Sequence, residues 1–332
     1  MAERSMRAVV IREFGGPEVL EVREVPRPEP GPWEIRVAVA ASGLNRADLL
    51  QRRGRYPVPH GSPADIPGLE YAGVVDRVGA LVRDWAPGDR AMGLVGGGGY
   101  AEAVVVHERE AIPIPEGIDT VAAGALPEAW LTAWDAMVLQ ADLQAGESVL
   151  IHAVGSGVGT AALQIARASG ARTLGTSRTP SKLERATALG LEVAIEGGDT
   201  DWPARVMDAT GGRGVDVVVD LVGGAYVAGD LACVAERGRI VVVGVPAGRE
   251  TGIDLRRLMS RRASITGTVL RARPLEEKIA LAREATRRLV PLMERSGAVP
   301  VVERTFPPEQ AAEAHRMMES NLNFGTLSIV WG

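Results

Sequence analysis

The feature that most constrains this chain is a regular alternation of apolar runs and helical stretches between Glu147 and Leu270. The apolar runs are Ser148–Ala153, Arg172–Thr176, Val193–Ile195, Val215–Val222, Arg239–Val245 and Ser264–Leu270. Strands that read as continuous apolar runs are covered on both faces, as in a parallel sheet with helices on each side. Only Val193–Ile195 fits weakly. The segment therefore predicts an α/β domain with a doubly wound parallel sheet.

A glycine cluster follows the first apolar run. Gly155, Ser156, Gly157, Val158 and Gly159 stand between that run and an expected helix at Thr160–Ser169. Glycine lets the backbone turn tightly and approach a pyrophosphate, whose charge is favoured by the free N–H groups of a helix N-terminus. A tight turn without a ligand is the alternative. We predict a Rossmann dinucleotide site with pyrophosphate contacts from Ser156, Gly157, Val158 and Gly159.

The end of the second apolar run distinguishes NADPH from NADH. An NAD-binding protein usually places an acid here to bind the ribose 2′-hydroxyl. No Asp or Glu occurs from Leu174 through Leu183, where Ser177, Arg178 and Lys182 instead offer a hydroxyl and cations to a 2′-phosphate. Lys182 equally fits a solvated position in the first turn of a helix. The pattern favours NADPH.

Two further strand ends are expected beside the dinucleotide, because ligands of open α/β sheets lie outside the carboxyl ends of the strands. Val222 stands at one of these ends, and Gly244 and Val245 stand at the other. The glycines there also fit plain turns. We predict all three residues as cofactor contacts.

The remainder of the chain predicts a second, β-rich domain. Glu34–Ala40 and Tyr100–Val106 alternate with the period of half-buried strands, and Val299–Phe306 and Thr326–Trp331 have the same character. The prediction is a barrel-like domain formed by residues 1–126 and 271–332, with the cofactor domain inserted at residues 127–270.

Composition limits the partners. The formal net charge is -5 and the basic residues are scattered among acids, so no basic stripe is present for nucleic acid. No apolar run approaches the ~20 residues that span a bilayer. Met1–Val10 lacks the apolar segment of a signal peptide, and Met1–Ser5 reads as an extension ahead of a first strand. We expect a cytoplasmic protein with no nucleic-acid or membrane partner.

Motifs spread over the chain resemble one enzyme family. They are Asn45-Arg46-Ala47-Asp48-Leu49, Gly68-Leu69-Glu70, Gly88-Asp89-Arg90, Pro127-Glu128-Ala129-Trp130-Leu131-Thr132-Ala133, Ser156-Gly157-Val158-Gly159-Thr160-Ala161-Ala162 and Ala314-His315-Arg316-Met317-Met318-Glu319. From about Met6 to the C-terminus the chain resembles the quinone oxidoreductase branch of the medium-chain dehydrogenase/reductase superfamily, above all its tumour-suppressor-inducible, NADPH-dependent members. The resemblance implies a GroES-like β-barrel catalytic domain, a Rossmann cofactor domain and an active site in the cleft between them.

Zinc-dependent members of that superfamily use a cysteine where this sequence has Asn45 and a histidine where it has Leu69. Cys233 is the only cysteine, which also excludes zinc sites built on several thiolates. Without a Lewis acid to stabilise an alkoxide, oxidation of simple alcohols is not expected. An electron-poor quinone takes a hydride without that help, because the nicotinamide carries the difficult step. The resemblance therefore implies a metal-free NADPH:quinone oxidoreductase.

The resemblance also implies active-site residues. Asn45, Asp48 and Tyr56 would line the nicotinamide and substrate site, Thr132 would contact the nicotinamide, and Asn323 would lie near the cofactor. Tyr56 either positions the acceptor, donates a proton to it or merely shapes the pocket. Asp48 equally fits a helix start, where a carboxylate is favourable in any protein. His152 is expected to be packed or hydrogen-bonded and not catalytic.

Other functions fit the same residues. Reduction of the activated double bond of an enone or enoyl thioester uses the same cofactor without a metal. A non-enzymatic alternative exists because the resembling branch includes an NADPH-binding lens crystallin and proteins that bind RNA, although the acidic net charge argues against RNA here. The resemblance also implies a homodimer that pairs through the sheet edge at Ser264–Leu270.

Overall fold

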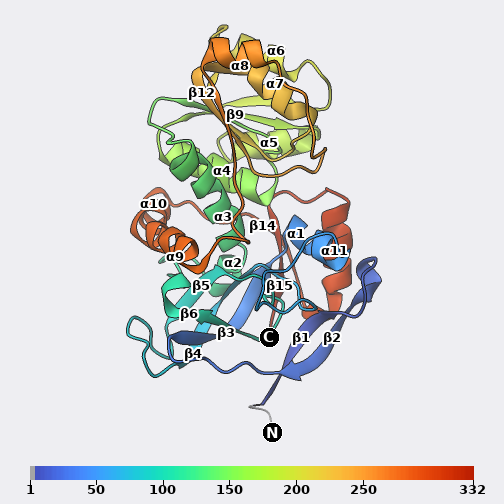
Figure 1. Cartoon of the computed structure of the whole chain (residues 1–332), viewed down its shortest axis with the longest axis vertical. Helices are drawn as coiled ribbons and strands as arrows, with labels where there is room; N and C mark the ends of the chain where they lie inside the picture. The colour runs from blue at the N-terminus through green and yellow to red at the C-terminus, as the bar shows by residue number, and fades with distance from the viewer. Residues whose placement is uncertain (1–3) are drawn as a thin grey trace. The chain divides into compact units, whose positions relative to one another are not determined.

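The computed structural model describes residues 4–332, which form two compact units. The first unit comprises the residues up to Leu131 together with Leu270–Gly332, and the second comprises Thr132–Val269. The first, blue strands of the chain and its last, red strands belong to the same unit (Figure 1). The predicted junctions fell after residues 126 and 270. Of the predicted N-terminal extension, residues 1–3 lie outside the described part of the chain.

A parallel sheet forms the core of the second unit. Its strands are β8 (Ser148–Ile151), β9 (Arg172–Ser177), β10 (Val193–Glu196), β11 (Val215–Asp220), β12 (Val234–Val242) and β13 (Ser264–Gly267), in the order β10-β9-β8-β11-β12-β13. All neighbouring strands are parallel. Val149, Leu150 and Val218 on the central strands are fully buried, as in a sheet covered on both faces. The predicted doubly wound sheet is confirmed.

Helices connect these strands. They are α4 (Gly157–Ala168), α5 (Pro180–Ala188), α6 (Trp202–Ala209), α7 (Ala225–Cys233) and α8 (Leu255–Arg261), preceded by α3 (Pro127–Trp134) and the π-helical η3 (Asp135–Gln140). Proline stands at the start of α5 and of α6, where its missing N–H removes no helical hydrogen bond. The prolines therefore mark the first turns of α5 and α6.

The first unit is built mainly on antiparallel strands. β1 (Ser5–Ile11) pairs with β2 (Leu20–Pro26). The larger sheet contains β3 (Glu34–Gly43), β4 (Glu70–Val78), β5 (Arg90–Leu94), β6 (Ala103–His107), β7 (Ile112–Pro113), β14 (Val302–Phe306) and β15 (Thr326–Val330). β3 pairs with β4 along one side and with β6 and β15 along the other, which joins the two halves of this unit. Among the described residues of this unit, only β14 and β15 pair in parallel.

Short helices close this unit. They are η1 (Pro17–Val19), α1 (Arg46–Arg52), η2 (Glu108–Glu110), α2 (Thr120–Ala123), α9 (Leu275–Glu284), η4 (Ala285–Leu289), α10 (Val290–Ser296), η5 (Pro308–Gln310) and α11 (Ala311–Glu319). The helices α9, η4 and α10 follow one another without a loop over Leu275–Ser296. The middle segment, η4, stands next to Pro291 and is π-helical, because proline lacks the N–H for a regular helical hydrogen bond.

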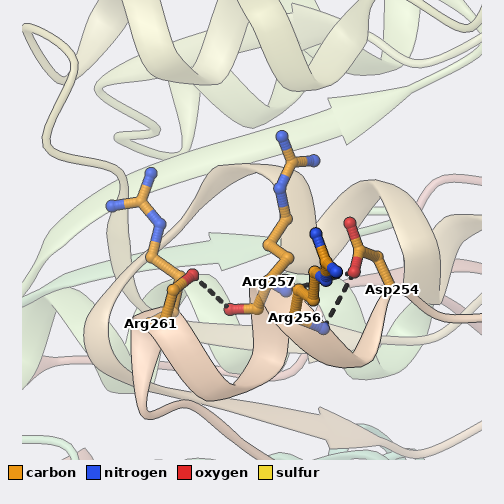
Figure 2. A pocket seen from close by; sticks show the side chains of 5 residues that line it. Asp254, Arg256, Arg257 and Arg261 are labelled. Atoms are coloured by element: carbon orange, nitrogen blue, oxygen red, sulfur yellow. Dashed lines mark hydrogen bonds between the residues drawn. The ribbon is translucent and has the colours of Figure 1, made fainter.

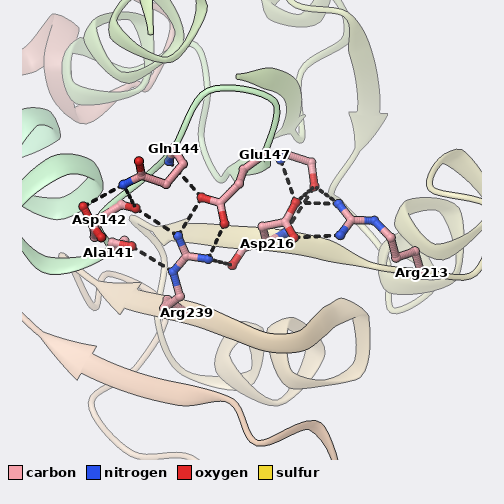
Figure 3. Close-up of polar contacts among 8 residues, drawn as sticks. Ala141, Asp142, Gln144, Glu147, Arg213, Asp216 and Arg239 are labelled. Atoms are coloured by element: carbon pink, nitrogen blue, oxygen red, sulfur yellow. Dashed lines mark hydrogen bonds and ion pairs between the residues drawn. The ribbon is translucent and has the colours of Figure 1, made fainter. Parts of the chain in front are cut away.

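An ionic network links the amino ends of β8 and β11 to Arg239 of β12 (Figure 3). Arg239 donates to both carboxylate oxygens of Glu147 over 2.8 and 2.7 Å. Arg213 pairs with Asp216 over 2.5 Å, and Oδ2 of Asp216 also accepts hydrogen bonds from the backbone and hydroxyl of Ser148, both over 2.8 Å. The network lies at the edge of the sheet opposite to the carboxyl ends of its strands and is therefore a structural feature.

The structure corrects the predicted bounds of several strands: β6 is Ala103–His107 and not Tyr100–Val106, β14 is Val302–Phe306 and not Val299–Phe306, and β12 and β13 differ as well. β12 was expected at Arg239–Val245, but it begins at Val234, and an irregularity around Arg237, whose φ is +60°, bends it. The polar Glu236-Arg237-Gly238 sequence resembles a turn, although it is a bulge inside the strand. Both β12 and the expected strand Ser264–Leu270 end early, at Val242 and Gly267.

The edge strands explain why β10 gave a weak signal. β10 and β13 are the outer strands of the parallel sheet, and both carry exposed residues. An edge strand has less surface to bury than a central one, so its sequence need not be continuously apolar.

Within residues 4–332, no helix has the length and apolar character that crossing a membrane requires.

Candidate functional site

Asn45 and Asp48 lie at the start of α1 in the first unit. Oδ2 of Asp48 accepts hydrogen bonds from the backbone N–H of Asn45 over 2.8 Å and from the hydroxyl of Tyr100 over 3.0 Å. Its Oδ1 accepts the N–H of Gly68 over 3.1 Å. Asp48 is fully buried, so these donors replace the water that a carboxylate loses on burial. Asp48 does occupy a helix start, which was the alternative to an active-site role.

Asn45 also reaches a second acid. Its Nδ2 donates to Oε1 of Glu70 over 2.7 Å, and the backbone N–H of Glu128 donates to Oε2 of Glu70 over 2.8 Å. Glu70 begins β4 and has no exposed surface, while Glu128 lies in the first turn of α3. One asparagine therefore contacts both Asp48 and Glu70. We call Asp48, Glu70 and Glu128 the carboxylate cluster.

The carboxylate cluster retains protons that exposed acids lose. Burial raises the pKa of Asp48 to about 6, that of Glu70 to about 8 and that of Glu128 to about 7. Hydrogen bonds to Glu70 oppose the rise in its pKa, and the negative charges of the other two acids add to it. Groups that titrate near neutral pH suit proton transfer, so the cluster is a candidate catalytic site.

Tyr56 lies under the guanidinium group of Arg271. The Cζ atom of Arg271 is 4.8 Å from the centre of the Tyr56 ring, a cation–π distance. Burial raises the pKa of Tyr56, and the charge of Glu128 raises it further. The phenol is therefore protonated at neutral pH and available as a hydrogen-bond donor.

The glycine cluster forms the turn between β8 and α4 in the second unit. Ser156 caps α4, and its Oγ accepts a hydrogen bond from the N–H of Gly159 over 3.0 Å. A Cβ atom on Gly159 would lie 2.5 Å from the carbonyl oxygen of Ala153, so this position requires glycine. Gly157 and Val158 form the first turn of α4, whose free N–H groups suit a pyrophosphate.

The end of β9 carries the residues predicted to bind a 2′-phosphate. Ser177 is the last residue of β9, and its Oγ accepts the N–H of Thr179 over 3.1 Å. Arg178 is exposed, and Lys182 lies partly exposed in the first turn of α5. The three predicted residues thus lie at the carboxyl end of β9 and in the first turn of α5, the helix that follows it.

The loops after β11 and β12 contact each other. The N–H of Ala247 donates to the carbonyl of Val222 over 2.9 Å. Gly223 has a φ of +69°, and a Cβ there would lie 2.8 Å from the Cα of Val245. Gly223 therefore permits the close approach that places Val222 beside Gly244 and Val245.

Together the residues of the second unit fit a dinucleotide. They provide a glycine-lined turn that a Cβ would fill, a helix N-terminus and a cation at the next strand end. Thr132 is buried on α3. Asn323 is buried in the first unit, where its Nδ2 donates to the carbonyl of Gly325 over 2.7 Å. The cofactor contacts of Thr132 and Asn323 stay predictions.

His152 is enclosed in a buried polar group, as expected. Its Nε2 lies 2.7 Å from Oδ1 of Asp230, and its Nδ1 lies 2.7 Å from the hydroxyl of Thr176. The rings of Trp202 and Tyr226 pack against it edge-on. All its polar atoms have protein partners, which indicates a structural role.

A polar hollow on α8 holds no comparable chemistry. Asp254, Arg256, Arg257, Ser260 and Arg261 line it (Figure 2). Oδ1 of Asp254 accepts the N–H groups of Arg256 and Arg257 over 2.9 and 3.2 Å, so its acid is an ordinary helix cap. No residue of α8 is buried. Among residues 4–332, no cluster of three or more His, Cys, Asp or Glu side chains is arranged to hold a metal ion.

Comparison with known proteins identifies the family. Residues 31–116 match the alcohol dehydrogenase GroES-like domain, and residues 157–286 match the zinc-binding dehydrogenase family. The chain is 35% identical to a quinone oxidoreductase of Pseudomonas aeruginosa, over 94% of this chain and 96% of that protein. It is 32% identical to the human quinone oxidoreductase, over 94% of each. The chain belongs to the quinone oxidoreductase branch of the medium-chain dehydrogenase/reductase family.

Solved structures agree on the fold of this oxidoreductase. A structure described as an NAD-dependent alcohol dehydrogenase is 35% identical, with a TM-score of 0.85 over 98% of this chain and 100% of the other. The CurK enoyl reductase is 27% identical, with a TM-score of 0.85 over 98% of this chain and 99% of the other. The predicted GroES-like and Rossmann architecture is confirmed, and with it a nicotinamide dinucleotide as the cofactor class.

Two positions at which zinc-dependent relatives have metal ligands hold Asn45 and Leu69 in this oxidoreductase. The Asn45 amide is a hydrogen-bond donor to Glu70, and Leu69 is a buried apolar residue. Sequence reasoning did not assign a role to Glu70, Glu128 or Arg271. Glu70 and Glu128 stand inside motifs that carried the family resemblance, so the sequence did contain an indication of their importance. Arg271 stands in no such motif, and only the structure places it on Tyr56.

Proposed function

We propose that this oxidoreductase uses NADPH to reduce a quinone without a metal ion. The observation that carries the proposal is the hydrogen bond from the Asn45 amide to Glu70, at the position where zinc-dependent relatives have a cysteine ligand. An amide is a poor ligand for zinc, so an acceptor must be electron-poor enough to react without a Lewis acid. Relatives named quinone oxidoreductases support the same acceptor class.

NADPH is the proposed cofactor because of the residues at the end of β9. Ser177 and Arg178 stand where an acid would bind the ribose of NADH, and Lys182 follows in α5. When bound, the dinucleotide supplies the hydride. Ser156, Gly157, Val158 and Gly159 would hold its pyrophosphate, Thr132, Val222, Gly244, Val245 and Asn323 would contact it, and Asn45, Asp48 and Tyr56 would contact the acceptor.

The first test is the initial rate of NADPH and NADH oxidation with ortho- and para-quinones, before and after treatment with a chelator. We expect quinone turnover that prefers NADPH and survives the chelator. Arg178→Gln should raise the KM for NADPH with little change for NADH. Arg172→Gln, an exposed arginine at the other end of β9, is the matched control. Equal use of both dinucleotides by the wild-type protein would contradict the NADPH assignment.

Reduction of activated double bonds is the second candidate, and the similarity to an enoyl reductase of known structure favours it. Enones and enoyl thioesters belong in the same assay. Turnover of these compounds without turnover of any quinone would move the assignment to double-bond reduction. Tight NADPH binding with no turnover at all would support a non-enzymatic role.

We also propose a homodimer formed through β13, the outer strand of the parallel sheet. Its residues are half-buried or exposed, and Val269 just beyond it is 51% exposed. An outer strand with unpaired backbone groups is a template for pairing with a second copy. Light scattering after size exclusion should return twice the monomer mass, and a monomer at micromolar concentration would contradict the proposal.

A further inference from the structure

Arg271 is a buried cation held by fixed acceptors. Its exposed fraction is 6%, and its Nη2 donates to Oε1 of Gln51 and to the carbonyl of Gly96, both over 2.6 Å. Nε donates to the same carbonyl over 2.8 Å. Gln51 belongs to α1, the helix for which Asn45 is the N-cap residue. The partners of Arg271 are neutral acceptors from two other segments of the same unit. They therefore fix the plane of the Arg271 guanidinium group without neutralising its charge.

One nitrogen of this guanidinium group lacks a partner. Nη1 of Arg271 is buried and makes no hydrogen bond within the protein. An unsatisfied buried donor costs free energy, about 1–3 kcal/mol and more for a charged group. Such a donor in a native structure calls for a ligand that satisfies it. The Tyr56 ring, at 4.8 Å, identifies the surroundings of Arg271 with the predicted acceptor site.

Two acids and a phenol act on the charge of Arg271. Burial lowers the pKa of Arg271, while Asp48, Tyr56 and Glu128 raise it. Burial raises the pKa of Glu128 to about 7, so this carboxyl is about half protonated at neutral pH, whereas Asp48, with a pKa of about 6, is mostly ionised there. These acids therefore keep Arg271 protonated.

We propose that Arg271, through its unpartnered Nη1 and with the Tyr56 ring beside it, binds the acceptor oxygen and stabilises the negative charge that develops there during reduction. This inference rests on the proposed function. It assigns to Arg271 the task that the zinc ion has in zinc-dependent relatives, which is to stabilise negative charge on the substrate oxygen. A hydride brings two electrons to the quinone, which becomes a hydroquinone monoanion as the reduced nicotinamide becomes oxidised. The anionic oxygen is held by Arg271 and then takes a proton delivered from water. Electrostatic stabilisation of this kind is a large component of many enzymatic rate accelerations.

A binding measurement tests the charge directly, without turnover. The probe is 4-nitrophenol, whose phenolate imitates the hydroquinone anion and is visible by absorbance, bound in the presence of NADP⁺. In the wild-type protein we expect the pKa of the bound phenol to lie below that of the free phenol by about 1–3 units, as beside an opposite charge. Arg271→Met should abolish this shift. Arg271→Gln, which removes the charge and keeps a donor for Gly96, should do the same.

Kinetics supply the second readout. With a series of para-quinones of graded reduction potential, Arg271→Met should lower kcat/KM by about 10²–10³-fold for the weakest acceptors, as loss of an oxyanion donor does. The loss should be smaller for the strongest acceptors, which stabilise their own anion. Arg109→Met removes a partly exposed arginine of the same unit, paired with Glu276, and should leave all rates unchanged.

The outcomes separate the two proposals. A wild-type protein that reduces no quinone contradicts the proposed function. Quinone turnover by the wild type, with no pKa shift of bound nitrophenol or with the same shift in both Arg271 variants, overturns the role of Arg271 alone. Circular dichroism and NADPH binding verify the fold of each variant, and Arg271→Gln carries the test where Arg271→Met does not fold. A uniform loss of rate over the whole quinone series also overturns the proposal.

Discussion

The side-chain amide of Asn45 donates a hydrogen bond to Glu70 over 2.7 Å, where a zinc-dependent relative has a metal ligand. Burial raises the pKa of Glu70 from 4.5 to about 8, so Glu70 is largely protonated at neutral pH. The folded protein therefore binds this proton more tightly than the unfolded chain does. The resulting stability is present below pH 4.5 and is lost as the pH rises through about 8.

Glu70→Gln should flatten this pH dependence, because glutamine does not ionise. We expect the free energy of unfolding of the wild type to fall relative to that of the variant between pH 4.5 and about 8, and the difference to level off above that range. Urea unfolding at a series of pH values measures it. Glu309→Gln, at an exposed carboxylate, is the control. Parallel curves for the wild type and Glu70→Gln would contradict a protonated Glu70.

Gly159→Ala should weaken dinucleotide binding. The added Cβ would lie 2.5 Å from the Ala153 carbonyl and 2.7 Å from the Val154 backbone, so the turn between β8 and α4 must shift. Overpacking of this kind costs about 1–3 kcal/mol. If that cost falls on the bound state, the Kd for NADPH rises roughly tenfold or more. Fluorescence titration measures the Kd, and Gly252→Ala, where a Cβ meets nothing within 4 Å, should bind as the wild type does.

Asp216→Asn should remove a pH-dependent part of the stability. Burial opposes ionisation of Asp216, but hydrogen bonds from Arg213 and Ser148 lower its pKa from 3.8 to about 2. The stability it contributes is present above pH 3.8 and is lost as the pH falls through about 2. At neutral pH we expect the variant to be about 1–2 kcal/mol less stable, with solvent screening taken into account. A difference that stays constant in unfolding curves recorded down to acid pH would disprove the ionic contribution.

Arg52→Met should destabilise the first unit far more than Arg53→Met. Both arginines pair with Glu319, but the side chain of Arg52 is fully buried and that of Arg53 is 44% exposed. Arg52 also contacts Nδ1 of the buried His315 over 3.1 Å. Removing one partner of a buried pair costs about 3–5 kcal/mol, whereas an exposed pair contributes about 0–1 kcal/mol. Thermal unfolding of the two variants should differ accordingly, and equal melting temperatures would refute the assignment.

Local patterns predicted much of the fold. The apolar runs located β8, β9, β11 and β12, because a central strand covered on both faces is apolar along most of its length. The edge strands β10 and β13 also coincide with predicted runs, although both carry exposed residues. The predicted strand bounds were less accurate where the fold departs from a regular pattern, as at the bulge near Arg237. That irregularity arises from pairing and packing with distant residues, which a local pattern does not contain.

The sequence by itself determined the turn between β8 and α4, because Ser156, Gly157 and Gly159 are neighbours in the chain and their geometry is local. It also determined that an asparagine stands at position 45 and a leucine at position 69. Only the tertiary structure decided that the Asn45 amide contacts Glu70 and that Arg271 lies on Tyr56. These contacts connect residues far apart in the sequence, and the pKa values they set depend on burial, which exists only once the chain has folded.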